Sequence, residues 1–239
     1  MFTKKWFLDL DRRLRDAGLD SDSASFDEIK SNLQNRKILG PDEFASAVAY
    51  VILAGGFSQK TAKIKHGEII KYLEKAGKNA NQADMLAIFN NKNKMAAILK
   101  IWQNRAAYRD GYYALSDFDA KLKYLSSLPH IGTITANHLA RNLGENVVKY
   151  DIWIQRLGVA FAQRTQGTRN PPSPRLRRAG GNREQNLESK INNGALDADV
   201  RRACDDMFAH LERETGLPRG YIDVVLWKAA QNKLIGNLI

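Results

Sequence analysis

The stretch LSSLPHIGTITANHLARNLGENVVKYDIWIQRL, Leu125–Leu157, decides the fold. Its pattern predicts a helix, a tight turn at 129–133, a second helix, a short loop and then an aspartate that opens a third helix. Pro129 ends the first helix because the residue before a proline avoids the α region, and Gly132 allows the close turn. The segment therefore predicts a helical hairpin followed by Asp151 at a helix N-terminus.

The turn of this hairpin is a candidate anion site. Backbone N–H groups at a helix N-terminus point outward and carry a partial positive charge, which favours phosphate. Here these N–H groups belong to the region of His130, Gly132 and Ile134. They are expected to bind one phosphate without reading base sequence.

Charge and composition support a polyanionic partner. Lys and Arg outnumber Asp and Glu by 37 to 26, which gives a net charge of +11 and a pI of about 9.7. Nucleic acid is the first expectation and an anionic membrane the second. Cys204 is the only cysteine, so no intramolecular disulfide and no thiolate-based zinc or iron–sulfur site can form. The longest apolar run is too short to cross a bilayer and the charged N-terminus is unlike a signal peptide, so a cytoplasmic, membrane-free protein is expected.

Helical periodicity dominates the chain, and no sustained period-two alternation occurs, which predicts an all-α fold. A capping-box pattern at Ser25 and Glu28 opens the second helix, and Pro41 suits a first helical position. Helices are expected over 4–18, from 25, over 44–56, 58–75, 81–89, 92–107, 117–128, 134–143, 152–163, 197–214 and 219–234. The Arg-rich segment 163–184 is expected to be a flexible loop, either a solvated connector or a basic flap that becomes ordered on a phosphate backbone.

Three segments in order resemble a known family. LPHIGTITA is similar to the LPGVGxxTA hairpin of the helix-hairpin-helix DNA glycosylase superfamily. VVKYDIWIQRL resembles the family's next segment, in which an aspartate opens a helix. FASAVAYVILAGGFSQKTA is similar to its early buried helix and the loop after it. The resemblance runs from about residue 44 to about residue 157.

The resemblance implies a two-lobed all-α fold with a central cleft. Residues 41–149 would form the helical barrel domain that carries the helix-hairpin-helix motif, and residues 1–40 plus 150–239 a discontinuous second domain. The partner would be DNA, double-stranded and with one base flipped into a pocket. Asp151 would be the catalytic carboxylate, because cleavage of the glycosidic bond passes through an oxocarbenium-like sugar that a carboxylate stabilises. The alternative is that Asp151 only caps the helix at 152–163.

The departures from the family pattern narrow the expected chemistry. Bifunctional members carry a lysine where this chain has Ile134, and isoleucine is not a nucleophile, so water is the expected nucleophile and no lyase activity is expected. His130 replaces the first glycine of the hairpin. Lys149, two residues before Asp151, is an alternative amine for the role of the missing lysine, but it is expected to contact phosphate or solvent. The family's iron–sulfur cluster is absent and no cofactor is required. By resemblance, the backbone carbonyls of Ser126, Leu128 and Ile131 would hold a K⁺ or Na⁺ ion.

A flipped base needs stacking surfaces and polar edges. Asp223 and Trp227 are four residues apart and share one helix face. For each aromatic candidate, ordinary packing in the core is the competing interpretation. The candidates for the pocket, or for the wedge that fills the gap left by the base, are Phe57, Gln59, Tyr150, Trp153, Asp223 and Trp227.

Two classes of function remain open. The first is a monofunctional DNA glycosylase that leaves an abasic site, acting either on a DNA lesion in base excision repair or on a hypermodified phage base in antiviral defence. The second is a non-catalytic DNA-binding module, since hairpins of this type also serve only to bind phosphate. A monomer is expected in either case.

Overall fold

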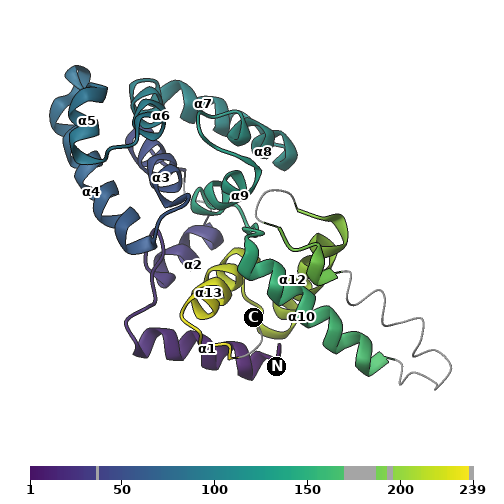
Figure 1. Cartoon of the computed structure of the whole chain (residues 1–239). Helices are drawn as coiled ribbons and strands as arrows, with labels where there is room; N and C mark the ends of the chain where they lie inside the picture. The colour runs from purple at the N-terminus through teal and green to yellow at the C-terminus, as the bar shows by residue number, and fades with distance from the viewer. Residues whose placement is uncertain (36–37, 170–186, 193–195, 237–239) are drawn as a thin grey trace. The chain divides into compact units, whose positions relative to one another are not determined.

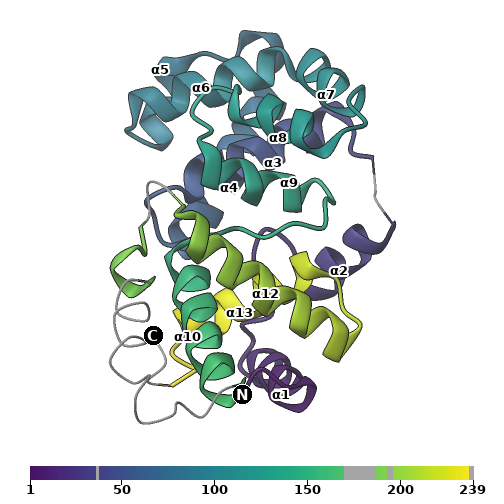
Figure 2. The ribbon, with the colours of Figure 1, turned by 90° about the vertical axis from the view of Figure 1, so that its right-hand side faces the viewer.

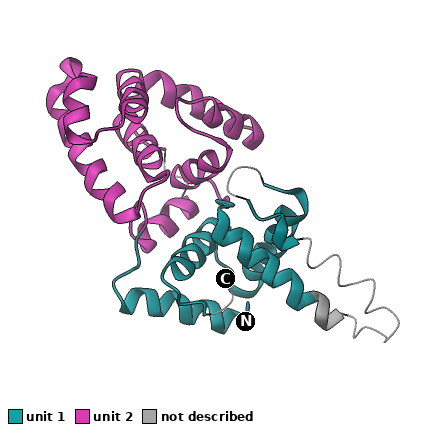
Figure 3. Ribbon diagram, viewed as in Figure 1, with its two compact units in different colours: residues 1–21, 148–239 teal, residues 22–147 magenta. Residues whose placement is uncertain are grey.

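The computed structural model describes residues 1–35, 38–169, 187–192 and 196–236, and the side chains of 166–169 are left aside. All regular elements in these residues are helices, which confirms the all-α prediction (Figure 1). The chain divides into two compact units, residues 1–21 with 148–239 (unit 1) and residues 22–147 (unit 2), as coloured in Figure 3. No helix of the described residues is long and apolar enough to cross a membrane.

Unit 2 is built around one apolar helix, α3. Its sequence FASAVAYVILA is apolar on nearly every side, and Phe44, Val48 and Ile52 are buried together with most of their neighbours. α3 contacts α4, α6, α7 and α9. The helices of unit 2 are α2 (Phe26–Asn35), α3 (Pro41–Ala54), α4 (Gln59–Ala76), the short 3₁₀ helix η1 (Gly77–Asn79), α5 (Gln82–Ile88), α6 (Lys92–Gln103), α7 (Arg105–Tyr113), α8 (Phe118–Ser126) and α9 (Thr133–Asn142).

The boundary of unit 2 differs from the expected one near its start. The expected domain began at residue 41, whereas the structure places 22–40 in this unit. The reason is long-range bonding: the buried Asp22 carboxylate accepts a hydrogen bond from Tyr50 at 3.0 Å, and the Leu39 N–H donates to the hydroxyl of Tyr113 at 3.0 Å. Phe26 and Leu33 of α2 are buried as well. The later boundary, 147/148, lies two residues from the expected one.

One expected helix is broken in two. The periodicity predicts a continuous helix over 92–107, but α6 ends at Gln103 and α7 begins at Arg105. Asn104 between them has φ −113° and ψ 21°, and its side-chain amide donates to the carbonyl of Lys100 at 2.9 Å. An asparagine that bonds to nearby backbone in this way competes with the helix ladder. The local hydrogen bond accounts for the break.

Unit 1 contains α1 (Lys4–Asp16), α10 (Ile152–Arg169), α12 (Ala198–Thr215) and α13 (Arg219–Gln231). α10 and α12 lie side by side in the two views (Figures 1 and 2). Their approach is close, since a Cβ atom at Gly158 would lie 2.5 Å from the sulfur of Cys204. α10 extends to Arg169, past the expected end at 163, so residues 163–169 of the expected Arg-rich loop are helical. The rest of that expected loop, 170–184, lies outside the described residues.

Candidate active site

Asp151 lies at the N-terminus of α10, where its side chain caps the helix. One carboxylate oxygen, Oδ1, accepts the backbone N–H groups of Trp153 at 3.1 Å and Ile154 at 3.2 Å. These N–H groups have no partner within the helix, so the carboxylate both satisfies them and lies at the positive end of the helix dipole. The cap fixes the direction in which the second oxygen, Oδ2, points.

A lysine lies beside this second oxygen, and a tryptophan lies beside the lysine. The ammonium of Lys149 is 3.4 Å from Oδ2 of Asp151 and 5.3 Å from the ring centroid of Trp227 on α13. The side chains of Lys149 and Asp151 are only 20% and 13% exposed. A half-buried carboxylate that keeps one oxygen out of the cap is able to stabilise a cation or direct a water molecule. Three residues that the sequence singles out, Lys149, Asp151 and Trp227, are thus brought together.

Gln155 holds the backbone of the residue that precedes Asp151 in the sequence. It is a site residue that the sequence analysis did not predict. Its side chain is fully buried, and its amide donates to the carbonyls of Tyr150 at 2.9 Å and Asn192 at 2.7 Å. Its carbonyl oxygen accepts the N–H of Asn192 at 3.0 Å. In the sequence, Gln155 is a polar amide among residues expected to be buried, such as Ile154 and Leu157. A buried amide must form hydrogen bonds inside the protein, and this is the signal that points to its role.

Tyr150 and Asp223 are buried rather than open to a ligand. The Tyr150 hydroxyl donates to Asp205 on α12 at 2.5 Å. Burial raises the pKa of the phenol, and the Asp205 carboxylate raises it further. Asp223 on α13 has no exposed surface. Tyr150 is 8% exposed, so neither side chain is open enough to serve as a stacking surface or polar edge of a pocket in this structure. Trp153 is half-buried, with the guanidinium of Arg156 5.4 Å from its ring.

The thiol of Cys204 is near this cluster but is not a reactive group. It is fully buried and donates to the carbonyl of Ile154 at 3.5 Å. Burial raises the pKa of the thiol, and the carboxylates of Asp205, Asp223 and Asp151 raise it further. A thiol held protonated in this way is a poor nucleophile.

The hairpin in unit 2 has the predicted layout, with α8 and α9 joined at 127–132. His130, which replaces a glycine of the family pattern, adopts φ +65°, a left-handed conformation that histidine tolerates better than most residues. Burial and the charge of Lys94 lower the pKa of His130. Leu128 and Ile131 are buried, and the Leu128 carbonyl accepts the Ile131 N–H at 3.1 Å.

One N–H of the expected phosphate site already has a partner. Gly132 is the N-cap of α9, and its N–H donates to the hydroxyl of Thr135 at 2.8 Å. A phosphate would compete with this hydroxyl. Ile134 lies in the first turn of α9, where backbone N–H groups lack partners within the helix. Its N–H therefore remains suited to an anion.

Phe57 and Gln59 flank the start of α4. The Phe57 ring is 43% exposed, whereas the Gln59 amide donates to Oδ1 of Asp22 at 3.3 Å. Asp22 also pairs with Arg141 on α9 at 2.5 Å, and both side chains are nearly fully buried. No local sequence pattern points to Asp22, since its partners lie up to 119 residues away.

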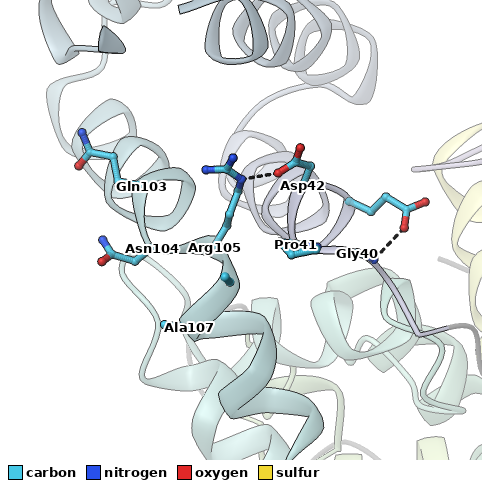
Figure 4. A pocket seen from close by; sticks show the side chains of 9 residues that line it. Gly40, Pro41, Asp42, Gln103, Asn104, Arg105 and Ala107 are labelled. Carbon is cyan, nitrogen blue, oxygen red and sulfur yellow. Dashed lines mark hydrogen bonds and ion pairs between the residues drawn. The ribbon is translucent and has the colours of Figure 1, made fainter. Parts of the chain in front are cut away.

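Each unit has a cavity whose lining includes none of the predicted site residues. In unit 2, a cavity of about 730 Å³ lies between the start of α3 and the α6–α7 break, where Arg105 pairs with Asp42 (Figure 4). In unit 1, a cavity of about 580 Å³ follows α10 from Ile152 to Gln163 and includes Glu188. No group of three or more His, Cys, Asp or Glu side chains suited to a metal occurs in the part of the chain that the structure describes.

Two solved structures are similar to this chain over nearly its whole length. A crystal structure of Methanocaldococcus jannaschii 8-oxoguanine DNA glycosylase aligns with a TM-score of 0.62 at 15% identity, covering 96% of this chain and 94% of that chain. A Methanocaldococcus jannaschii 8-oxoguanine glycosylase/lyase in complex with 15mer DNA containing 8-oxoguanine aligns with a TM-score of 0.57 at 14% identity, covering 95% and 98%. No protein-family model and no curated protein matches the sequence. The chain therefore has the all-α fold of these 8-oxoguanine DNA glycosylases.

Proposed function

We propose that this protein is a monofunctional DNA glycosylase. It hydrolyses the N-glycosidic bond of a damaged or modified base that is flipped out of double-stranded DNA, and leaves an abasic site. The observation that carries this proposal is the half-buried carboxylate of Asp151, fixed by the start of α10 with its second oxygen outside the cap. The fold shared with 8-oxoguanine DNA glycosylases supports it.

Asp151 supplies the electrostatic part of the reaction. As the bond between sugar and base breaks, positive charge develops on C1′ and the ring oxygen, and a nearby carboxylate stabilises it. The base leaves with the bonding electron pair, water adds its oxygen to C1′, and the proton that this water loses goes to the departing base. The cap holds the carboxylate in place throughout, so little reorganisation is required at the moment of reaction.

Ile134 is the reason to propose hydrolysis without lyase activity. A lyase step needs an amine that forms a Schiff base with the sugar. One of the similar proteins is described as a glycosylase/lyase, but this chain has an aliphatic side chain at the matching position of its hairpin motif. We assign Lys149 to a DNA phosphate, together with His130 and the N–H groups of the hairpin.

The first base to test is 8-oxoguanine, because both similar structures are of proteins named for it. A DNA lesion points to base excision repair in the cell, and a hypermodified phage base to antiviral defence. Phe57, Trp153 and Trp227 are the proposed aromatic contacts to the DNA. A K⁺ or Na⁺ ion on the carbonyls of Ser126, Leu128 and Ile131 is proposed only from the family resemblance.

A non-catalytic DNA-binding module is the second candidate. It is favoured by one observation: Oδ1 of Asp151 is fully engaged as a helix cap, a structural role that needs no chemistry. In that case the hairpin binds phosphate and no base is released.

Base release from a panel of DNAs tests the proposal. The panel holds duplexes with 8-oxoguanine, uracil or an alkylated purine, and phage DNA with modified pyrimidines. Alkali reveals abasic sites, and borohydride traps any Schiff base. We expect alkali-sensitive sites in one substrate with no trapped adduct. Salt-sensitive binding without release from any substrate would favour the binding module, and a trapped adduct would contradict the monofunctional assignment.

A further inference from the structure

One side of α4 is exposed along nearly its whole length and carries lysines. We call this side the α4 face; it consists of Lys60, Ile64, Gly67, Lys71 and Lys75, all of them exposed. At about 100° per residue, these five positions lie within about 80° of one another around the helix axis. The buried side chains of α4 lie on the opposite side of the helix, and α4 contacts α3.

The lysines of the α4 face have no acidic partner within the described residues. Glu68 and Glu74 flank the face on its two sides, and Glu68 already pairs with Lys65 at 2.8 Å. Lys71 and Lys75 are four residues apart, a spacing at which like charges destabilise a helix. The face therefore keeps positive charges together although they repel one another.

The first turn of α4 adds to this cost. Lys60 lies there, no acidic residue does, and the helix dipole disfavours a cation at a helix N-terminus. The same dipole favours Lys75 in the last turn. The arrangement of Lys60 and of the pair Lys71 and Lys75 is thus not explained by the stability of the helix alone.

A glycine lies in the middle of the α4 face. Gly67 is inside an 18-residue helix, where glycine is less favourable than alanine. Packing within the chain does not require it, because a Cβ atom at Gly67 would meet no further atom of the described chain within 4 Å. A glycine that neither turns the chain nor makes room for another side chain is typical of a place where a ligand comes close to the helix.

These features together indicate a polyanionic partner that lies along α4. Local choices that weaken an element without a gain inside the protein are expected at functional sites. From Lys60 to Lys75 the face is about 22 Å long, since a helix rises 1.5 Å per residue. That length corresponds to about six phosphates along one DNA strand. The net charge of +11 fits the same partner.

The α4 face is separate from the hairpin, the other proposed phosphate contact of unit 2. α3 contacts both α4 and α9, and in Figure 1 α4 lies to the left of α3 and α8 to its right. We propose that the α4 face is a second DNA-binding surface, which binds the phosphate backbone of duplex DNA beyond the phosphates that the hairpin holds. The proposal rests on DNA as the partner of the proposed function. Phosphate contacts carry no base information, so the face binds undamaged DNA as well.

Salt-dependent binding to an undamaged duplex tests the charge of the face. Lys71→Gln/Lys75→Gln is compared with Lys4→Gln/Lys5→Gln, which removes the same charge from exposed lysines of α1. The first variant should make the slope of log K against log salt shallower by about 2, one for each lost phosphate contact, and the second should leave it unchanged. Equal slopes in the two variants would show that only net charge matters and would overturn the proposal.

Gly67 supplies a readout that a purely structural role would not give. Gly67→Ala should raise the melting temperature, because alanine is the better helix former. It should nevertheless weaken DNA binding, because the added methyl group holds the phosphate backbone away from the helix. The longer side chain of Gly67→Gln should weaken binding about tenfold, the effect of forcing extra atoms into a close contact. A higher melting temperature in Gly67→Ala with wild-type affinity in both variants would overturn the proposal.

The same measurements separate this inference from the proposed enzyme and from a membrane partner. A shallower slope in Lys71→Gln/Lys75→Gln, without base release by the wild type from any DNA of the panel, would uphold the α4 face and reject the enzyme. Base release by the wild type with an unchanged slope in the variant would reject the face alone. If this variant loses binding to vesicles of phosphatidylserine and phosphatidylcholine and keeps the wild-type slope on DNA, the face belongs to a membrane surface and the proposal is overturned.

Discussion

Two helices of unit 1 begin in the same way and in different surroundings. At α10, Asp151 accepts the N–H groups of Trp153 and Ile154, and Lys149 lies 3.4 Å from its other oxygen. At α12, Asp197 accepts the N–H groups two and three residues ahead at 2.9 and 3.3 Å, and Lys190 lies 3.6 Å away. An aspartate cap with a lysine nearby is therefore not a site by itself.

The surroundings separate the two caps. The Asp151 side chain is 13% exposed and that of Asp197 is 32% exposed. Lys149 lies against the ring of Trp227, whereas Lys190 is drawn to a second carboxylate, Asp199, at 2.5 Å. The interaction energy between charges is larger where water is excluded. Only the α10 cap combines a shielded carboxylate with an aromatic side chain, and only there do we propose chemistry.

A third aspartate extends the comparison to full burial and gives the largest expected effect on stability. Asp22 is bonded to Arg141, Tyr50 and Gln59 inside unit 2. Asp22→Asn leaves the buried guanidinium of Arg141 without its counter-charge, so the free energy of unfolding should fall by about 3–5 kcal/mol. Urea denaturation measures this loss. Asp197→Asn is the control, and an equal loss in both variants would contradict the assignment of Asp22 as the structural carboxylate.

The two lysines should differ in DNA binding. Lys149→Gln removes a proposed phosphate contact, so the slope of log K against log salt should become shallower by about 1. Lys190→Gln should leave the slope unchanged, because its ammonium already binds Asp197 and Asp199. Lys190→Gln should keep nearly the wild-type melting temperature, since its partner Asp199 is 54% exposed and exposed ion pairs contribute little. Fluorescence anisotropy at several salt concentrations checks this, and equal slopes in the two variants would remove the distinction between the caps.

The smallest effect concerns His66, which belongs to unit 2. Burial lowers its pKa below the ordinary 6.5, and the ring bonds to the hydroxyl of Ser46 at 3.0 Å. Between the lowered pKa and 6.5 the unfolded chain binds more protons than the folded one, so stability should fall as the pH drops through 6.5. His66→Gln should remove that part of the acid dependence. Urea denaturation above and below this pH tests it, and an identical pH profile in the variant would show that His66 does not contribute.

The sequence predicts the helices well and their long-range partners poorly. The caps at Ser25 and Pro41 and the hairpin at Pro129 are local signals, and the structure contains each of them. Asn104 breaks a helix through a hydrogen bond that periodicity does not record.

The side chains that hold the candidate site together were not predictable in the same way. Gln155 and Asp22 bond to partners as far as 37 and 119 residues away, and one sequence does not encode those pairings in any local pattern. The sequence predicts a place in the base pocket for Asp223 and Tyr150, but both side chains are buried. Tertiary contacts decide which side chains are buried. From the sequence alone, an aromatic or acidic side chain on one helix face is therefore compatible with a place in a binding pocket and with a place in the core.

The most direct test of the account is base release by Asp151→Asn, measured with its stability and with Asp197→Asn as the control. Asparagine retains the cap, so the free energy of unfolding of both variants should stay within about 1 kcal/mol of the wild type. On the DNA identified by the panel, Asp151→Asn should slow single-turnover base release at least about 100-fold, because the charge that stabilises the sugar cation is lost. Asp197→Asn should retain the wild-type rate. Release by Asp151→Asn at the wild-type rate would contradict the catalytic assignment and leave Asp151 as a helix cap alone.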